Sequence, residues 1–164
     1  MTVKALAVTI STRAASGVYE DRSGPVLAEL LSEYGCHVRG PVIVPDGVSV
    51  KTVLEQAVAA GFDVVVPSGG TGLTATDQTP EMTRQVITRE VPGIADAIRL
   101  GNRETVPTSI LSRGLAGIAG NTLIVNLPGS TGGVRDGMAI LGPVLAHAID
   151  QIGGGDHPRP SDGA

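Results

Sequence analysis

The chain has 164 residues, a formal net charge of −4 and a hydrophobic content of 41%. This length fits one domain of the usual size, about 100–200 residues. With no Trp and one Phe, the core must consist of aliphatic side chains. The acidic balance and the absence of a basic run argue against nucleic-acid binding, which requires clustered Lys and Arg to neutralise phosphates.

Cysteine usage and hydropathy indicate the compartment. Cys36 is the single cysteine, so no internal disulfide can form, and a reducing compartment fits. We expect Cys36 to be an inert thiol in the core. No apolar run approaches the roughly 20 residues that span a bilayer, and the N-terminus lacks the layout of a signal peptide. The sequence therefore predicts a cytoplasmic protein that does not enter a membrane.

The first half of the chain alternates β-branched runs with helical hydrophobic spacing. The predicted strands are Lys4–Ile10, Val38–Val44 and Asp63–Val66. One helix is expected from Ser23, with Pro25 in its first turn, to Gly35. A second is expected to begin at Ser49, as its N-cap, and to end at Gly61.

The second half is less regular. Thr79-Pro80-Glu81 predicts a helix start with Thr79 as its cap. Two short helices, a strand and a long helix are then expected over Gly93–Asn102, Thr108–Leu115, Thr122–Leu127 and Val134–Ile152, respectively. Residues 1–152 would form the domain, and the Gly- and Pro-rich segment 153–164 is expected to be a disordered tail.

Alternating strands and helices imply right-handed βαβ units, hence an α/β fold with a mostly parallel sheet. Ligands of such sheets bind beyond the carboxyl ends of the strands. We therefore expect four polar loops on one rim of the sheet: Ser11–Ser23, Pro45–Gly47, Ser68–Asp77 and Pro128–Gly133.

The most distinctive of these loops is Ser68-Gly69-Gly70-Thr71-Gly72, directly after a buried strand. Its glycines allow positive φ and close backbone approach, so several N–H groups can point at one anion. The following helix would add the positive end of its dipole. The motif is neither a Walker A loop nor GxGxxG. From the residues alone, a phosphate site and a simple tight turn remain equally open.

Asp46 and Asp77 lie on two of the rim loops. A carboxylate beside a phosphate is repelled unless a cation lies between them, and Mg²⁺ takes one or two carboxylates together with phosphate oxygens. The alternatives are structural, because Pro-Asp-Gly is an ordinary turn and Asp77 could cap the next helix. Ser130 is similarly ambiguous, as a donor to an anion or as a turn serine.

Three arginines are candidate anion partners, because a guanidinium matches phosphate geometry, although each is equally explained as a solvated side chain. They are Arg13, Arg113 and Arg135. His37, His147 and His157 share no metal-ligand spacing and are expected to be structural or solvent-facing. No Ser/His/Asp or Cys/His constellation stands out.

Taken in order, the motifs of this chain resemble the Mog/MoaB family, the molybdopterin adenylyltransferases of molybdenum cofactor biosynthesis. The resemblance covers about residues 4–150 and is specific through the order and spacing of its pieces. They are Ser11-Thr12-Arg13, Ser16-Gly17-Val18-Tyr19-Glu20-Asp21, Pro45-Asp46, Gly69-Gly70-Thr71-Gly72, Asp77-Gln78-Thr79-Pro80-Glu81, Glu90-Val91-Pro92-Gly93, Ser109-Ile110-Leu111-Ser112-Arg113 and Leu127-Pro128-Gly129-Ser130.

The resemblance implies a three-layer α/β/α sandwich, a homotrimer and contact with other molybdenum-cofactor enzymes. It implies Mg²⁺-dependent transfer of the adenylyl group of ATP to molybdopterin, with release of pyrophosphate. Asp46 and Asp77 match the two functional aspartates and would hold the metal. The other implied binding residues are Gly69, Gly70, Thr71 and Gly72 for phosphate, Pro128, Gly129 and Ser130 for the nucleotide or pterin, and Ser109, Ser112 and Arg113 of a further motif.

The resemblance leaves the branch of the family open. The segment Gly17–Asp21 looks more like Mog, whereas Gly72-Leu73-Thr74 and the Pro-Gly-Ser-Thr loop look more like MoaB. The alternative function is therefore a catalytically silent molybdopterin-binding or carrier protein of the MoaB branch. Retention of Asp46 and Asp77 argues against it, because a carrier needs no metal-bound ATP.

Overall fold

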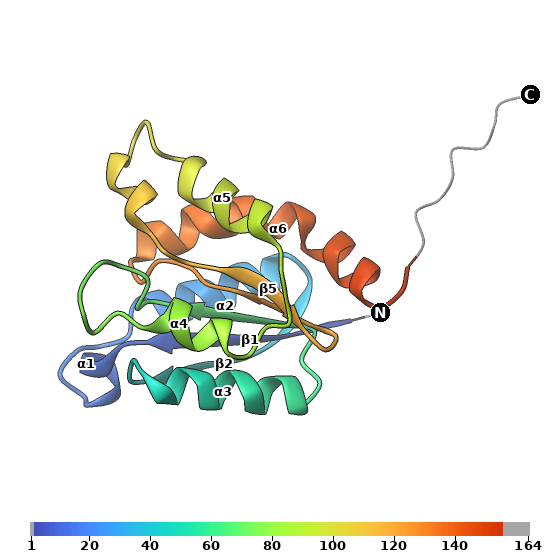
Figure 1. Ribbon diagram of the computed structural model, residues 1–164, viewed down its shortest axis with the longest axis horizontal. Helices are drawn as coiled ribbons and strands as arrows, with labels where there is room; N and C mark the ends of the chain where they lie inside the picture. Colours follow the sequence, from blue (N-terminus) through green and yellow to red (C-terminus); the bar gives the residue numbers. More distant parts are fainter. Residues whose placement is uncertain (1, 156–164) are drawn as a thin grey trace, which may run out of the picture.

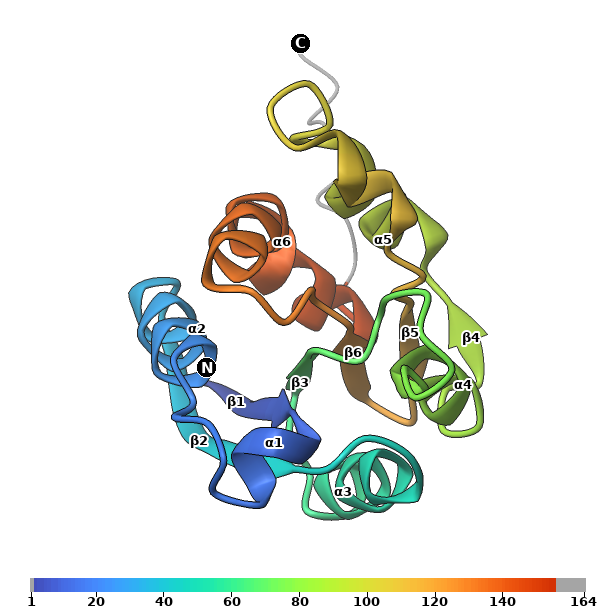
Figure 2. The ribbon, with the colours of Figure 1, turned by 90° about the vertical axis from the view of Figure 1, so that its left-hand side faces the viewer.

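The computed structural model describes residues 2–155. A sheet of six strands runs through the middle of the molecule (Figure 1), in the order β2-β1-β3-β6-β5-β4, and Figure 2 labels all of its strands. The first four of these strands are mutually parallel, and β5 and β4 add an antiparallel edge. The strands are β1 Val3–Ile10, β2 Cys36–Val44, β3 Val64–Ser68, β4 Arg89–Glu90, β5 Ala116–Ala119 and β6 Thr122–Val125.

Helices cover both faces of the sheet (Figure 2). Helices α2, α5 and α6 pack on one face, and α3 and α4 pack on the other. The predicted three-layer α/β/α sandwich is confirmed. The helices are α1 Thr12–Ala15, α2 Ser23–Glu33, α3 Val48–Ala59, α4 Thr79–Arg84, α5 Pro92–Leu100 and α6 Thr131–Ile152, with a 3-10 helix η1 at Pro107–Leu111.

The central strands β1, β3 and β6 are largely buried, as their apolar runs predict, whereas the edge strands β2 and β4 are mostly exposed or half-buried. Because side chains alternate along a strand, Ala5 and Ala7 of β1 face α2 and α6, while Leu6 and Val8 face α3. In β3, every residue from Val64 to Ser68 is buried. Aliphatic residues make up these two layers, in agreement with the composition.

Two predicted helix caps are wrong. Helix α3 begins at Val48 after the N-cap Gly47, not at Ser49, and α4 has Gln78, not Thr79, as its N-cap. The carboxylate of Asp46 accepts hydrogen bonds from the backbone N–H of both Gly47 and Gln78. A side chain from outside α4 therefore contributes to its start, and local sequence does not show such a contact.

The predicted helix Thr108–Leu115 is also wrong beyond η1, and the edge strands β4 and β5 were missed. Residues 112–115 are extended because Leu115 pairs with Asn126 at the end of β6: Leu115 N donates to Asn126 Oδ1 at 3.0 Å, and Asn126 N donates to Leu115 O at 2.8 Å. The resulting β5 pairs antiparallel with β6. Short strands of this kind have too few residues to show a period in the sequence.

Other expectations concern single residues. Cys36 is 8% exposed, and burial raises the pKa of its thiol, as expected for an inert core cysteine. His37 and His147 are exposed, while His157 and most of the predicted tail lie outside the described residues. No helix within residues 2–155 has the length and apolar character needed to cross a membrane.

Candidate functional site

The glycine loop after β3 has the backbone conformation that its sequence predicts. Gly69 and Gly70 have φ of +110° and +65°, a region that other residues rarely adopt. A Cβ atom at Gly69 would lie 2.2 Å from the carbonyl oxygen of Ile10, the last residue of β1. Only glycine therefore lets the loop lie directly against the end of the neighbouring strand.

The loop after β6 lies directly beside the glycine loop. Ser68 Oγ donates to the carbonyl oxygen of Pro128 at 2.9 Å, and Gly69 N donates to that of Leu127 at 2.9 Å. A Cβ atom at Gly129 would be 3.1 Å from Gly69 Cα. The two loops that the sequence places on one rim thus form a continuous backbone surface.

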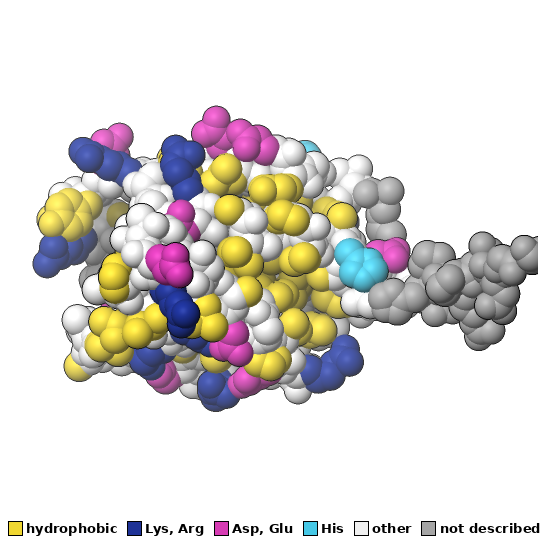
Figure 3. Space-filling view, turned by 90° about the horizontal axis from the view of Figure 1, so that it is seen from above, with side chains coloured by type: hydrophobic (Ala, Val, Ile, Leu, Met, Phe, Trp, Pro, Cys, Tyr) yellow, Lys and Arg dark blue, Asp and Glu magenta, His cyan; other side chains and the backbone are white. Residues whose placement is uncertain are grey.

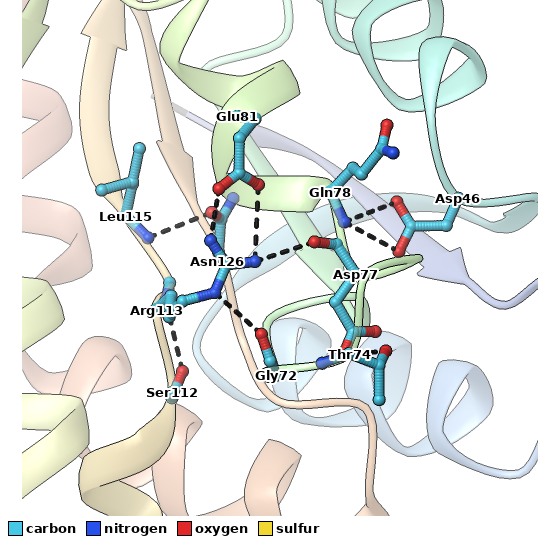
Figure 4. A network of polar contacts seen from close by, with 11 residues as sticks. Asp46, Gly72, Thr74, Asp77, Gln78, Glu81, Ser112, Arg113, Leu115 and Asn126 are labelled. Atoms are coloured by element: carbon cyan, nitrogen blue, oxygen red, sulfur yellow. Dashed lines mark hydrogen bonds and ion pairs between the residues drawn. The ribbon is translucent and has the colours of Figure 1, made fainter.

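Asp46 lies on the other side of the glycine loop. Its carboxylate accepts from Gly47 N at 2.7 Å and from Gln78 N at 3.2 Å, so the loop after β2 is joined to the start of α4 (Figure 4). A Cβ atom at Gly70 would come within 2.3 Å of Asp46 Oδ2. The carboxylate is therefore packed against the backbone of Gly70.

Asp77 closes the other end of the same loop. Its Oδ2 accepts from Thr74 N at 3.1 Å and from Thr74 Oγ1 at 2.7 Å. It would lie 2.7 Å from a Cβ atom at Gly72. The carboxylate of Asp77 thus shapes the loop through Thr74. The alternative prediction, that Asp77 caps α4, is wrong, because the N-cap of α4 is Gln78.

The two aspartates produce an excess of negative charge around the glycines. Partial burial raises the pKa of the Asp46 carboxyl, and the nearby Asp77 and Glu81 raise it further, against the hydrogen bonds from Gly47 and Gln78. A cation would relieve this charge. Within residues 2–155, no three His, Cys, Asp or Glu side chains are grouped to hold a metal. Two carboxylates still fit Mg²⁺ when phosphate oxygens and waters complete its shell.

A large pocket opens on one side of the glycine loop, between the carboxyl ends of β1 and β3. We call it the first pocket; its volume is about 880 Å³. Strand β1 leads to β2 on one side while β3 continues to the other, so the pocket occupies the point where such sheets bind ligands. Its lining includes Ser11, Tyr19, Asp21, Ser68, Gly69, Gly70, Asp77 and Gly129.

A second pocket of about 530 Å³ lies on the opposite side of the same loop, toward α5 and α6. Its walls carry more apolar side chains, among them Leu73, Ile98, Val106 and Leu111. Four residues line both pockets: Thr71, Gly72, Pro128 and Ser130. The glycine loop and the loop after β6 therefore separate two cavities and are accessible from each.

The remaining predicted site serines have structural partners in addition to their place in the pockets. Ser130 is the N-cap of α6, since its Oγ accepts from Gly133 N at 3.0 Å. Ser109 Oγ donates to the carbonyl oxygen of Arg99 at 2.8 Å, and both Ser109 and Ser112 line the second pocket. The structural role of Ser130 is thus that of a helix N-cap and not of a turn serine, and its position between the pockets is compatible with ligand contact.

The three candidate arginines differ in their surroundings. Arg113 lines neither pocket, because its guanidinium binds the carbonyl oxygens of Gly72 and Asp77 and pairs with Glu81. Arg13 donates to Tyr19 Oη at 2.8 Å and stacks on that ring at 5.2 Å. Arg135 is exposed on α6.

Asp21 is a site residue that sequence reasoning left without a role. Its carboxylate accepts from Thr9 Oγ1 at 2.8 Å and from Gly24 N at 2.9 Å, so it holds the loop before α2 against β1. This loop forms one wall of the first pocket. The motif containing Asp21 was visible in the sequence, but its contact with Thr9 depends on the packing of α2.

The fold and this geometry define an open α/β domain in which two ligand pockets meet at a glycine-rich loop. Comparison with known families makes the class specific. Residues 6–147 match the family model described as "Probable molybdopterin binding domain". The chain belongs to this family.

Two curated relatives illustrate its range. A protein of Helicobacter pylori strain J99, named molybdopterin adenylyltransferase, is 37% identical over 152 residues, which are 88% of this chain and 85% of the relative. A protein of Chlorobaculum tepidum, named molybdenum cofactor biosynthesis bifunctional protein, is 34% identical over 92% of this chain. This chain spans only 48% of that longer relative.

Solved structures of both branches have the same fold. The molybdopterin biosynthesis Mog protein of Mycobacterium ulcerans is 49% identical, with a TM-score of 0.89 over 94% of this chain and 99% of that one. The MoaB enzyme of Thermus thermophilus is 38% identical, with a TM-score of 0.86 over 94% of this chain and 98% of that one.

Proposed function

We propose that this chain is a molybdopterin adenylyltransferase acting in molybdenum cofactor biosynthesis. A terminal phosphate oxygen of molybdopterin attacks the α-phosphorus of ATP. The new P–O bond gives adenylylated molybdopterin, and the bond between the α-phosphorus and its bridging oxygen breaks to release pyrophosphate. The name and the 37% identity of the relative from Helicobacter pylori support this assignment.

The observation that carries the proposal is the position of the glycine loop between two pockets. A reaction that joins two phosphate-bearing molecules needs both phosphates at one place, and the loop has access to both cavities. Both substrates are polyanions, so catalysis must come from positioning and from neutralisation of charge. Gly69, Gly70, Thr71 and Gly72 would bind phosphate through the loop, and Pro128, Gly129 and Ser130 would complete it.

Mg²⁺ belongs to the proposal as the cation that the two aspartates would hold. Asp46 packs against Gly70 and Asp77 against Gly72, and partial burial, with the charges of Asp77 and Glu81, raises the pKa of the Asp46 carboxyl. When bound there, the ion would neutralise phosphate charge. The first pocket, which Asp77 lines, is the cavity in which the metal-bound triphosphate would lie.

The chain is closer in sequence to the Mog structure from Mycobacterium ulcerans than to the MoaB structure from Thermus thermophilus. This supports the Mog branch and the adenylylation reaction. In the alternative, a carrier without catalysis, the chain would bind molybdopterin without consuming ATP. The two aspartates beside the glycines would then have no metal-bound triphosphate to hold.

Association of copies is a further part of the proposal. We expect a homotrimer, and exposed hydrophobic side chains occur on the outer helices, including Leu100, Ile110 and Val144. Figure 3 shows hydrophobic side chains gathered on the face that carries α5 and α6. Exposed apolar patches commonly mark interaction surfaces. The longer bifunctional relative also supports contact with another enzyme of the same biosynthesis.

The test is incubation of the purified chain with molybdopterin and Mg-ATP, with detection of adenylylated molybdopterin and of pyrophosphate. We expect both products in equal amounts from the wild-type chain and neither from Asp46→Asn or Asp77→Asn. Full activity in these two variants would refute the metal role. Binding of molybdopterin without release of pyrophosphate would establish the carrier alternative.

A further inference from the structure

Arg113 makes an unusually complete set of contacts for a half-exposed arginine. Its Nε donates to the carbonyl oxygen of Gly72 at 2.8 Å, and its Nη2 donates to that of Asp77 at 2.8 Å. Its Nη1 forms an ion pair with Glu81 of α4 (Figure 4). One side chain thus binds both ends of the segment between Gly72 and Asp77, and the helix that follows it.

The backbone of Arg113 continues the same contact. Arg113 N donates to the carbonyl oxygen of Thr71 at 2.8 Å. Thr71 and Gly72 line both pockets, and Asp77 lines the first. The hydrogen bonds of Arg113 therefore reach the part of the glycine loop that the proposed substrates would contact, although Arg113 itself lines neither pocket.

The segment that carries Arg113 is itself held in place. Arg99 of α5 donates from Nη1 to the carbonyl oxygens of Gly114 at 2.7 Å and Ser112 at 3.4 Å. Arg99 is in turn paired with Asp96 at 2.7 Å. Arg99 thus binds the carbonyl oxygens of both neighbours of Arg113, Ser112 and Gly114. These contacts fix the backbone of Arg113, so its guanidinium can hold the glycine loop in one position.

We propose that Arg113 is a positioning residue, which holds the glycine loop and the Asp77 carboxylate in the geometry that adenylyl transfer requires. This inference rests on the proposed function for its catalytic part. In this role Arg113 holds the loop rather than a substrate phosphate, since its guanidinium is engaged by Gly72, Asp77 and Glu81. Arginine suits this task because its rigid planar group presents five donors in fixed directions, whereas lysine offers one ammonium.

The effect should appear in the order of the loop rather than in global stability. The side chains of Arg113 and Glu81 are 35% and 50% exposed, and exposed ion pairs contribute little to folding. Misplacement of catalytic groups by about 1 Å is enough to slow a reaction roughly 100-fold. Loss of the contacts with the loop should therefore lower kcat far more than the thermal midpoint.

The experiment compares Arg113→Lys, Arg113→Ala and Glu81→Gln with Arg84→Ala and Glu90→Gln. The Arg84–Glu90 ion pair is a matched control, since Arg84 is also on α4 but its partner lies on β4, away from the glycine loop. We expect kcat to fall by about 10- to 100-fold in the first three variants, with KM for Mg-ATP changed less than threefold. The double variant Arg113→Ala with Glu81→Gln should be no slower than Arg113→Ala alone, and the controls should match wild type.

Glu81→Gln separates this role from direct phosphate binding. If Arg113 bound a substrate, removing the charge of Glu81 would free it, so that KM for Mg-ATP would fall while kcat stayed unchanged. That outcome would overturn the inference.

Hydrogen exchange of backbone amides 72–77 in the ligand-free chain supplies a readout that needs no activity. These amides should exchange at least tenfold faster in Arg113→Lys and Glu81→Gln than in wild type, and at the wild-type rate in Arg84→Ala. Unchanged exchange in the first two variants would also overturn the inference. If wild type formed no product, the proposed function would fail, while the exchange rates would still decide whether Arg113 holds the loop.

Discussion

The carboxylate of Asp46 lies against the backbone of Gly70, so closely that a Cβ atom on Gly70 would be 2.3 Å from Asp46 Oδ2. The same Cβ atom would be 2.3 Å from Thr79 Oγ1, which is buried without a hydrogen-bond partner. Gly70 thus separates a partly buried carboxylate from a buried hydroxyl. The missing side chain at Gly70 is a condition for the position of Asp46.

Gly70→Ala should therefore disturb both the fold and the site. The φ of +65° costs an L-residue about 1–2 kcal/mol, and the new methyl group must displace Asp46 or Thr79. We expect a lower free energy of unfolding, measured in urea, and loss of product formation. Gly93→Ala is the control, because a Cβ atom there meets nothing within 4 Å and the residue is in the first turn of α5. Wild-type activity in Gly70→Ala would contradict this account.

Asp46→Asn should stabilise the chain at neutral pH while abolishing activity. The pKa of Asp46 is raised in the folded state, so the folded chain binds its proton more tightly than the unfolded chain. The contribution of Asp46 to the free energy of unfolding therefore falls as pH rises from its pKa in the unfolded chain, about 3.9, through its raised pKa in the folded chain. Above the folded pKa this loss of stability is complete. Urea unfolding of wild type and variant across pH 3–8 measures the difference.

The sign of that difference is the decisive result. We expect the free energy of unfolding of Asp46→Asn to exceed that of wild type by a growing margin as pH rises. In acid, the two free energies should converge. Mg-ATP should raise the unfolding midpoint of wild type but not that of Asp46→Asn. A variant that loses stability relative to wild type as pH rises would show that Asp46 is a stabilising carboxylate, not one kept for a cation.

Thr9→Val should loosen the wall of the first pocket. Thr9 is 4% exposed, and its hydroxyl is the donor that joins Asp21 to β1. Losing this hydrogen bond with little change of shape should cost about 1 kcal/mol in the free energy of unfolding. Because Asp21 shapes the pocket wall, KM for Mg-ATP should rise. Thr52→Val, whose hydroxyl bonds only within the exposed face of α3, should leave KM unchanged.

Ser130 allows helix capping to be separated from the charge at the site. Ser130→Ala removes the cap of α6 and should cost about 1 kcal/mol of stability. Ser130→Asp retains a cap of similar quality but places a negative charge where both pockets meet. We expect Ser130→Asp to unfold at the wild-type midpoint yet to bind Mg-ATP at least tenfold more weakly in calorimetry. Equal binding by Ser130→Asp and wild type would place the phosphates away from Ser130.

The sequence predicted the parts of this protein that depend on local pattern. Strands β1, β3 and β6 follow apolar runs that are buried in the sheet, and β2 follows a β-branched run at its edge. The glycines after β3 have the positive φ that their residue type allows. The rule that parallel strands share one functional rim then placed Asp46, Gly69 and Pro128 near one another, and the structure agrees. Order and spacing of motifs were sufficient to identify the family, which the comparisons confirm.

Only the tertiary structure decided which groups the polar side chains of the rim contact. Arg113 resembled an anion ligand in the sequence, yet its guanidinium binds the glycine loop and Glu81. Asp46, from the loop after β2, accepts a hydrogen bond from Gln78 N, so a side chain from another part of the chain contributes to the start of α4. The physical reason is common to both. A local pattern fixes the backbone conformation of a segment, but the partner of a polar side chain depends on which distant backbone groups packing brings within about 3 Å of it.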